Sequence, residues 1–351
     1  MKIGVFIPNW VGDAAMCTPA LRALRRHHGP GAQIIGVMRP YVADVLAGTP
    51  WLDETVFFDR KSNDPAQHTA AVWRYLRDQR LDAIVLMTNS FRSGAMALLS
   101  RAPVRVGYAR YGRGALLTHK LYSPRKRFGW LATPAIDAYL QLAYATGCEM
   151  EPPRLELATL PVDEAAADRV WRKWRLPPGD QVLVLNSGGA YGAAKSWPSE
   201  YFAELARRLV TDYDLSVLVT CGPTEQAAEQ KITALADHPR VVGLADEPLS
   251  IGLTKACIRR SRMLVTTDSG PRFFAVAFDL PVISLFGPTD VAWTRTHYSR
   301  ETCLHHAVPC GPCAQRTCPL GHHDCMRLLT VDRVYAAVQA QLHQPVVWQA
   351  A

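Results

Sequence analysis

An acidic residue stands at the point where the sequence predicts the first strand to end and a helix to begin. Residues 2–8 form an apolar run, and the segment that follows ends in Asp13. Ligands of open α/β sheets bind at the carboxyl ends of the strands, so a carboxylate there can remove a proton from a bound hydroxyl group. It can also cap the first amides of the helix. Asp13 is therefore a candidate general base, with helix capping as the alternative.

Two glycine-containing loops in the second half of the chain have the composition of an anion site. Residues 187–198 and 268–270 each follow an apolar run that predicts a strand. Glycine lets the backbone approach an anion, lysine supplies a positive charge, and helix N-terminal amides attract phosphate. Residues 187–198 lack the Walker ending, and the loop after the first predicted strand lacks the three-glycine dinucleotide motif. They predict a diphosphate site, with a plain flexible loop and simple helix capping as alternatives. Its candidate residues are Ser187, Gly188, Gly189, Lys195, Asp268, Ser269 and Gly270.

Basic residues are concentrated in one stretch of the first half. The net charge is +8, and residues 83–136 contain no acidic residue. This stretch predicts either a solvated face or a surface that binds anions such as phosphorylated molecules or acidic lipids. No nucleic-acid-binding motif accompanies it, so no nucleic-acid partner is expected. The basic residues are Arg92, Arg101, Arg105, Arg110, Arg113, Lys120, Arg125, Lys126 and Arg127.

Five of the nine cysteines lie within residues 303–325. The spacing of Cys310, Cys313, Cys318 and Cys325 could supply four thiolates to a structural zinc ion, with His322 and His323 as competing ligands. Reduced thiols or a disulfide are the alternative, and an iron–sulfur cluster is a remote one. No catalytic role is expected for these cysteines.

The order of predicted elements indicates two α/β domains. A chain of 351 residues is long enough for two, and short β-branched runs alternate with amphipathic segments, as in parallel sheets with crossover helices. We predict two facing Rossmann-like domains with a cleft between them, at 1–160 and 161–330. A helix at 331–345 is expected to pack back on the first domain. The predicted strands are 2–8, 33–38, 54–59, 83–87, 182–187, 216–221, 241–244, 263–267 and 282–286, and the clearest helix is 199–211.

No apolar run approaches the roughly 20 residues that a membrane-spanning helix needs. The first residues lead directly into a predicted strand, and they do not have the pattern of a signal peptide. We therefore expect a soluble, cytoplasmic protein.

Five segments in order resemble glycosyltransferase family 9, and within it the ADP-heptose:lipopolysaccharide heptosyltransferase II branch. They read PNWVGD at 8–13, NSFRS at 89–93, GAYGAAKSWP at 189–198, TDSG at 267–270 and LFGPT at 285–289. The resemblance covers about residues 2–340. It implies a GT-B fold, a donor bound mainly by the C-terminal domain, an acceptor bound by the N-terminal domain, and inverting transfer.

The resemblance also implies roles for single residues. Asp13 corresponds to the general base, Lys195 to the lysine that neutralises the donor phosphates, and Asp268 to the aspartate of the donor motif. Phe273 stands where the family has a histidine, which leaves the donor sugar open, and Arg272 beside it could contact a donor phosphate. The donor-binding residues would be Ser187, Gly188, Gly189, Glu225, Asp268, Ser269 and Gly270. The acceptor-binding residues would be Asn89, Arg92, Arg125, Lys126 and Arg127.

These implications predict an enzyme that transfers heptose from ADP-heptose to the inner core of lipopolysaccharide. It would need no cofactor for catalysis. Its acceptor would be a phosphorylated glycolipid, so a peripheral contact with the cytoplasmic face of the inner membrane is expected. The alternatives are a GT-B transferase with another nucleotide-sugar or acceptor, a nicotinamide-dependent dehydrogenase, and a non-catalytic metal-binding or nucleic-acid-binding protein.

Overall fold

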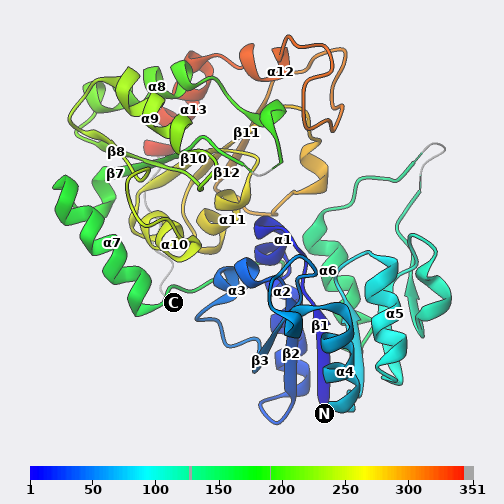
Figure 1. Cartoon of the computed structure of the whole chain (residues 1–351). Coiled ribbons are helices and arrows are strands. Elements are labelled where there is room, and N and C mark those ends of the chain that lie inside the picture. Colours follow the sequence, from blue (N-terminus) through cyan, green and yellow to red (C-terminus); the bar gives the residue numbers. More distant parts are fainter. Residues whose placement is uncertain (126–128, 190, 344–351) are drawn as a thin grey trace. The chain divides into compact units, whose positions relative to one another are not determined.

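The computed structural model describes residues 1–125, 129–189 and 191–343, and the chain divides into two compact units (Figure 1). The first unit comprises Met1–Ala158 together with Ala292–His297. The second comprises Thr159–Val291 and the chain from Tyr298 onward. The division at residue 158 lies close to the boundary predicted from the sequence.

The first unit is built on a six-stranded parallel sheet in the order β3-β2-β1-β4-β5-β6. Its order reverses between β1 and β4, and such a switch point is where open α/β sheets bind their ligands. The strands are β1 (Lys2–Phe6), β2 (Gln33–Met38), β3 (Glu54–Phe57), β4 (Ala83–Leu86), β5 (Val104–Tyr108) and β6 (His119–Leu121). The helices are α1 (Val11–Met16), α2 (Thr18–His28), α3 (Pro40–Leu46), α4 (Thr69–Asp78), α5 (Phe91–Leu99) and α6 (Ala135–Tyr144), with short 3₁₀ turns at Pro65–Gln67 and Arg113–Leu116.

The second unit repeats this topology with a parallel sheet in the order β12-β11-β10-β7-β8-β9. Its switch point lies between β7 and β10. The strands are β7 (Val182–Asn186), β8 (Ser216–Thr220), β9 (Val241–Gly243), β10 (Met263–Thr267), β11 (Val282–Phe286) and β12 (Glu301–His305). The helices are α7 (Pro161–Trp174), α8 (Ser199–Asp212), α9 (Gln226–Ala236), α10 (Ile251–Arg260), α11 (Gly270–Ala277), α12 (Asp324–Arg327) and α13 (Val331–Leu342), with 3₁₀ turns at Gly179–Gln181, Ala193–Lys195 and Val291–Trp293.

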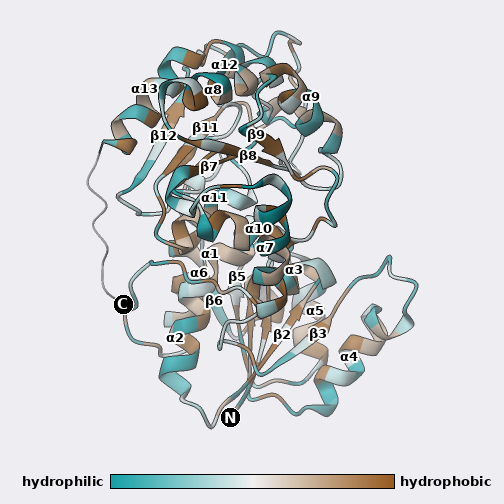
Figure 2. Ribbon diagram, turned by 90° about the vertical axis from the view of Figure 1, so that its left-hand side faces the viewer, coloured by the Kyte–Doolittle hydropathy of each residue, from teal (hydrophilic) through white to brown (hydrophobic). Residues whose placement is uncertain are grey.

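Continuous apolar runs form the central strands because both faces of each sheet are covered. Every residue of β7, β8, β10 and β11 is buried. In Figure 2 the strands are largely in the brown of hydrophobic residues, whereas helices such as α2 and α10 carry teal, hydrophilic surface. The predicted α/β class with two Rossmann-like domains is confirmed. None of the described helices is long and apolar enough to span a membrane.

Helix α13 differs from its prediction in where it packs. Its apolar face, formed by Val331, Val334, Val338 and Leu342, belongs to the hydrophobic core of the second unit, together with residues of α8. The expectation that this helix packs on the first domain is wrong. The amphipathic pattern identifies the face to be buried, but it does not identify the surface that buries it.

Candidate active site

The two predicted anion loops meet at the switch point of the second unit. The register of the sheet places Asn186, at the end of β7, beside Thr266 of β10. The Asn186 amide donates hydrogen bonds to Thr266 Oγ1 at 3.0 Å, to Ser269 Oγ at 2.9 Å and to the backbone oxygen of Gly188 at 3.1 Å. One buried side chain therefore ties both loops to the strand ends.

The glycines allow these loops and the start of α9 to approach each other closely. A Cβ atom on Gly188 would lie 2.2 Å from the carboxyl carbon of Glu225, and one on Gly189 would lie 3.1 Å from Ser269 Cβ. Glu225 is the N-cap residue of α9, and its Oε2 accepts a 2.7 Å hydrogen bond from the amide of Gly222. The Glu225 carboxylate, which the resemblance assigns to donor binding, thus lies against the loop predicted to hold the diphosphate.

The Lys195 side chain joins the two loops by an ion pair. Its Nζ lies 2.5 Å from Asp268 Oδ2 and 3.0 Å from the backbone oxygen of the same residue. Only 11% of the Lys195 side chain and 4% of the Asp268 side chain is exposed, so the pair lies where charge interactions are stronger than in water. Burial raises the pKa of Asp268, but Lys195 and Arg272 outweigh burial and hold this pKa below its usual value. Asp268 accepts two of the three ammonium protons. Among the described residues the third has no hydrogen-bond acceptor, although the Tyr191 ring centroid lies 4.4 Å from Nζ.

Two further groups around this ion pair can serve an anionic ligand. Ser187 is buried, and its hydroxyl oxygen has no hydrogen-bond partner among the described residues. Ser269 is the N-cap residue of α11, yet its side chain accepts no hydrogen bond from the described helix amides. A buried hydroxyl without a partner is costly, and the amides of a helix N-terminus favour negative charge. The arrangement is suited to the oxygens of a diphosphate.

Phe273 contributes no polar group to this site. Its side chain is buried in the interior of the second unit, as is that of its neighbour Phe274. The histidine expected at position 273 is therefore replaced by a packing residue.

In the first unit, a buried tyrosine holds the candidate base. Asp13 lies in the first turn of α1, and its Oδ1 accepts a 2.8 Å hydrogen bond from the Tyr139 hydroxyl on α6. Burial, with Asp13 as its neighbour, raises the pKa of Tyr139 well above the usual value. The phenol therefore stays protonated at neutral pH and remains a donor. No local pattern in the sequence indicates this role, because 126 residues separate the two side chains.

Asn89 lies at the switch point of the same sheet and contacts a buried arginine. The Arg113 guanidinium donates to Asn89 Oδ1 at 3.0 Å and to the backbone oxygens of Thr88 and Tyr108 at 2.5 and 2.8 Å. Burial lowers the pKa of Arg113 to about 10. The prediction that the basic stretch forms a solvated or anion-binding face is wrong for Arg113, which instead fixes the loop after β4.

Other members of the basic stretch lie near the protein surface. Arg92 is half-buried at the start of α5, and Arg125 is exposed. Trp130 lies close to two guanidinium groups, with the Cζ atoms of Arg110 and Arg125 at 4.1 and 4.5 Å from its ring centroid. Such contacts hold arginine side chains in place while leaving them charged. Lys126 and Arg127 lie outside the described residues.

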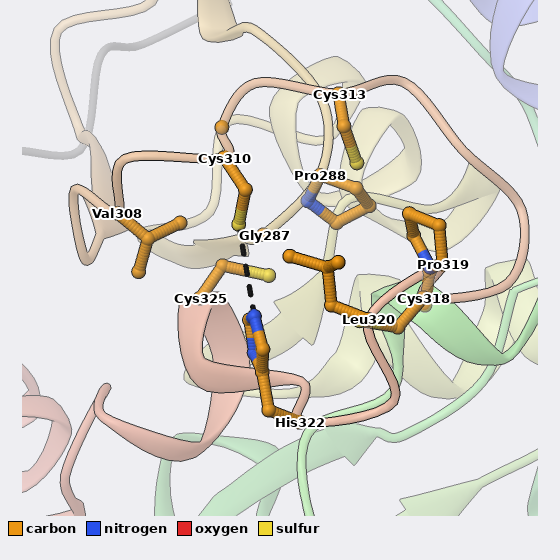
Figure 3. A pocket seen from close by; sticks show the side chains of 12 residues that line it. Gly287, Pro288, Val308, Cys310, Cys313, Cys318, Pro319, Leu320, His322 and Cys325 are labelled. Atoms are coloured by element: carbon orange, nitrogen blue, oxygen red, sulfur yellow. Dashed lines mark hydrogen bonds between the residues drawn. The ribbon is translucent and has the colours of Figure 1, made fainter.

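Four of the clustered cysteines line one pocket with His322 (Figure 3). Cys310, Cys313 and Cys318 lie in the loop before α12, which we call the cysteine loop, and Cys325 lies in α12 itself. All four are free thiols, and Cys310 Sγ lies 3.9 Å from His322 Nε2. Burial, with the three other thiols nearby, raises the pKa of Cys325. Backbone amides, that of His323 foremost, lower the pKa of Cys318. Among the described residues, no group of three or more His, Cys, Asp or Glu side chains is arranged to hold a metal ion.

The cysteine loop also packs against the loop that carries Lys195 and against the loop after β11. The amide of Ala194 donates to the backbone oxygen of Arg316 at 3.0 Å, and the Tyr191 hydroxyl donates to that of Ala314 at 2.5 Å. The amide of Ala314 in turn donates to the backbone oxygen of Pro288 at 2.8 Å. This loop therefore braces the segment that carries Lys195.

Comparisons with known proteins identify relatives along the whole chain. Residues 69–323 match the model of glycosyltransferase family 9 (heptosyltransferase). The chain is 26% identical to lipopolysaccharide heptosyltransferase 2 of Salmonella typhimurium, over 98% of this chain and 99% of the relative. The structure of Escherichia coli ADP-heptose lps heptosyltransferase II matches with a TM-score of 0.78 and 22% identity, over 97% of this chain and 98% of that one. A glycosyltransferase family 9 structure from Veillonella parvula matches with a TM-score of 0.81 and 20% identity, over 97% of each chain.

Proposed function

Because the chain belongs to glycosyltransferase family 9, we propose that it transfers heptose from ADP-heptose to the inner core of lipopolysaccharide. The observation that carries this proposal is the Lys195–Asp268 pair at the sheet edge where Ser187 and the N-terminus of α11 also lie; the Ser187 hydroxyl has no partner among the described residues. These groups would receive the diphosphate of a nucleotide-sugar. The full-length relatives named for heptose transfer to lipopolysaccharide support the donor and the acceptor.

In the proposed reaction, an acceptor hydroxyl attacks the anomeric carbon of the donor while the bond to the diphosphate breaks. Asp13 takes the proton of that hydroxyl, and Tyr139 keeps the carboxylate in place through its hydrogen bond to Oδ1. Attack on the face opposite the leaving group inverts the anomeric configuration. The positive charge of Lys195 and the amides of α11 stabilise the departing diphosphate. They supply the charge neutralisation that the step requires, so we propose no cofactor for it.

The braced position of the cysteine loop suggests a structural role for its thiols. Its backbone contacts fix Ala194 and Tyr191, which flank Lys195 in the folded loop. The structural zinc predicted from the spacing of Cys310, Cys313, Cys318 and Cys325 stays a prediction, as do the reduced thiols that were its alternative. Neither enters the proposed reaction.

We also propose that the basic surface of the first unit contacts anionic lipid. Exposed aromatic and apolar side chains accompany its charges, since Phe91, Tyr111, Tyr122 and Leu131 are each more than half exposed. Basic residues are attracted to anionic headgroups, and aromatic residues favour the membrane interface. We define this basic surface by Arg92, Arg101, Arg110, Lys120 and Arg125.

A donor screen tests the proposed function. The protein is incubated with ADP-heptose, UDP-sugars and GDP-sugars, each with and without lipopolysaccharide core that lacks the transferred heptose. We expect nucleoside diphosphate to be released from ADP-heptose, and only when the core acceptor is present. If nucleoside diphosphate were released from another nucleotide-sugar and not from ADP-heptose, the proposed donor would be wrong. Phe273, which replaces the histidine of the family, leaves this outcome open. Release with no acceptor product would contradict transfer.

Asp13→Asn and Tyr139→Phe test the proposed base. The amide oxygen that Asp13→Asn introduces can still accept from Tyr139, so we expect near-normal thermal stability but a turnover lowered by at least about 10²-fold. Tyr139→Phe removes one hydrogen bond to the carboxylate and should lower turnover by roughly tenfold, a smaller loss. Both variants should bind ADP as the wild type does. An Asp13→Asn enzyme that is active but destabilised would favour the capping role instead.

The lipid contact is tested by sedimentation with vesicles of phosphatidylcholine, alone or mixed with phosphatidylglycerol. The triple variant Arg101→Ser/Lys120→Ser/Arg125→Ser should bind the anionic vesicles about 100-fold more weakly, because each basic residue near such a surface contributes about 1 kcal/mol. Salt should weaken binding of the wild type. The matched control is Arg60→Ser/Lys61→Ser/Arg74→Ser, which removes three exposed basic residues outside the basic surface, and it should bind like the wild type. Equal binding of the wild type to both kinds of vesicle would refute the contact.

A further inference from the structure

A buried arginine stands directly behind the Lys195–Asp268 pair. Arg272 follows Asp268 by four residues, in the first turn of α11, and none of its side chain is exposed. Its Nη1 lies 3.3 Å from Asp268 Oδ1. The rings of Phe273 and Phe286 lie 5.0 and 4.9 Å from its guanidinium carbon. The donor aspartate therefore has a cation on each side.

Glu301 of β12 balances this arginine. The Arg272 Nε and Nη2 atoms donate to its two carboxylate oxygens, Nη2 at 3.1 Å. The Ser284 hydroxyl donates to Glu301 Oε1 at 2.6 Å. Only 4% of the Glu301 side chain is exposed. A forked contact of this kind fixes the orientation of a guanidinium more firmly than a single bond would.

The result is a buried row of alternating charges that runs from the edge strand to the anion loop: Glu301, Arg272, Asp268 and Lys195. Each oxygen of the Asp268 carboxylate has an assigned partner, Oδ1 with Arg272, and Oδ2 with Lys195 and with the Thr289 hydroxyl at 2.8 Å. The plane of the carboxylate is therefore fixed, and the position of the Lys195 ammonium follows from it.

We propose that Arg272 and Glu301 form a positioning pair that orients Asp268 and thereby places Lys195 for the donor diphosphate. This inference rests on the proposed donor site and adds to it the residues that set its geometry. It differs from the sequence expectation that Arg272 could itself contact a donor phosphate, because the Arg272 guanidinium is directed to Asp268 and Glu301.

A buried ion pair is costly to form, and apolar residues of similar volume can often replace it without loss of stability. Stability alone therefore gives little reason for charges at these two positions. Their location one contact away from the donor lysine gives a functional one. When a diphosphate shares the charge of Lys195, Arg272 still faces the Asp268 carboxylate and keeps it ionised.

The test is the double variant Arg272→Met/Glu301→Gln, which removes both charges and keeps an acceptor for Ser284. We expect a folded protein whose KM for the donor rises about tenfold, the size of a lost hydrogen bond to a charged group. The acid limb of its kcat/KM profile should move to higher pH. The sign follows because Arg272 favours the ionised form of Asp268, so its loss raises the pKa of that carboxyl. Among the described residues, the charged groups facing Asp268 are Lys195 and Arg272, with Glu301 and the Cys303 thiol around Arg272.

Two further proteins keep the test decisive. Arg272→Lys keeps the positive charge but loses the two-point contact with Glu301. Its kcat/KM profile should therefore have the acid limb of the wild type, while its KM for the donor should stay raised. The matched control is Arg22→Met/Glu151→Gln, which removes an equally buried Arg–Glu pair of the first unit, with a contact of 2.6 Å. This control should change thermal stability only.

The proposal would be overturned if the Arg272→Met/Glu301→Gln variant kept the wild-type KM for the donor and the wild-type acid limb of kcat/KM. The pair would then have a purely structural role. The failure of the proposed function is seen separately, in the wild type. If the wild type uses another nucleotide-sugar, the same comparison is made with that donor. If it turns over none, calorimetric binding of ADP at several pH values replaces KM, with the same loss of affinity expected.

Discussion

The ammonium group of Lys195 is held between two oxygens of Asp268, at the point where the sheet of the second unit reverses its strand order. The two residues lie 73 positions apart and meet only because β7 and β10 are neighbours in the sheet. Burial makes each charge costly, and the opposite charge of the other residue offsets part of that cost. The glycines, the Asn186 amide and the cysteine loop all serve to bring their loops into contact. The proposed chemistry of the donor depends on this pair.

The two units share one topology, and the proposed function gives them different tasks. In each unit the candidate loops follow the two strands at the switch point, β1 and β4 in the first unit and β7 and β10 in the second. Ligands of such sheets bind at this place. In the second unit those loops present a lysine, an unpartnered serine hydroxyl and helix amides, which suit an anionic leaving group. In the first unit they present a carboxylate fixed by a neutral tyrosine, which suits removal of a proton. Because the backbone topology is shared, the proposed roles of the two units differ only through their side chains.

The central strands can be predicted from the sequence because they leave a local signal. Central strands of a parallel sheet are continuous apolar runs, and all nine predicted strands are present. The three strands that the sequence does not predict, β5, β6 and β12, lack that signal. Val104–Tyr108 includes an arginine, His119–Leu121 has three residues, and Glu301–His305 is an edge strand with polar residues. Edge strands are less completely buried, so their composition is less apolar.

Contacts between distant segments could not be predicted in the same way. Nothing in one sequence pairs Tyr139 with Asp13 or Glu301 with Arg272, because each pair depends on which elements become neighbours. The sequence groups Arg113 with surface charges for the same reason, although the backbone oxygens around it form its binding partners. Charge counts identify where basic residues are concentrated, but burial decides which of them can reach a ligand.

The affinity for ADP, measured by calorimetry on the wild type and on Lys195→Met, tests the central claim most directly. Methionine keeps most of the length and the apolar stem of lysine but carries no charge, so the diphosphate loses its nearest cation in a region of lowered dielectric. We expect ADP to bind Lys195→Met at least about tenfold more weakly than the wild type, the size of a lost charge-assisted hydrogen bond. A variant that folds normally and binds ADP with wild-type affinity would contradict the placement of the diphosphate at Lys195 and Asp268.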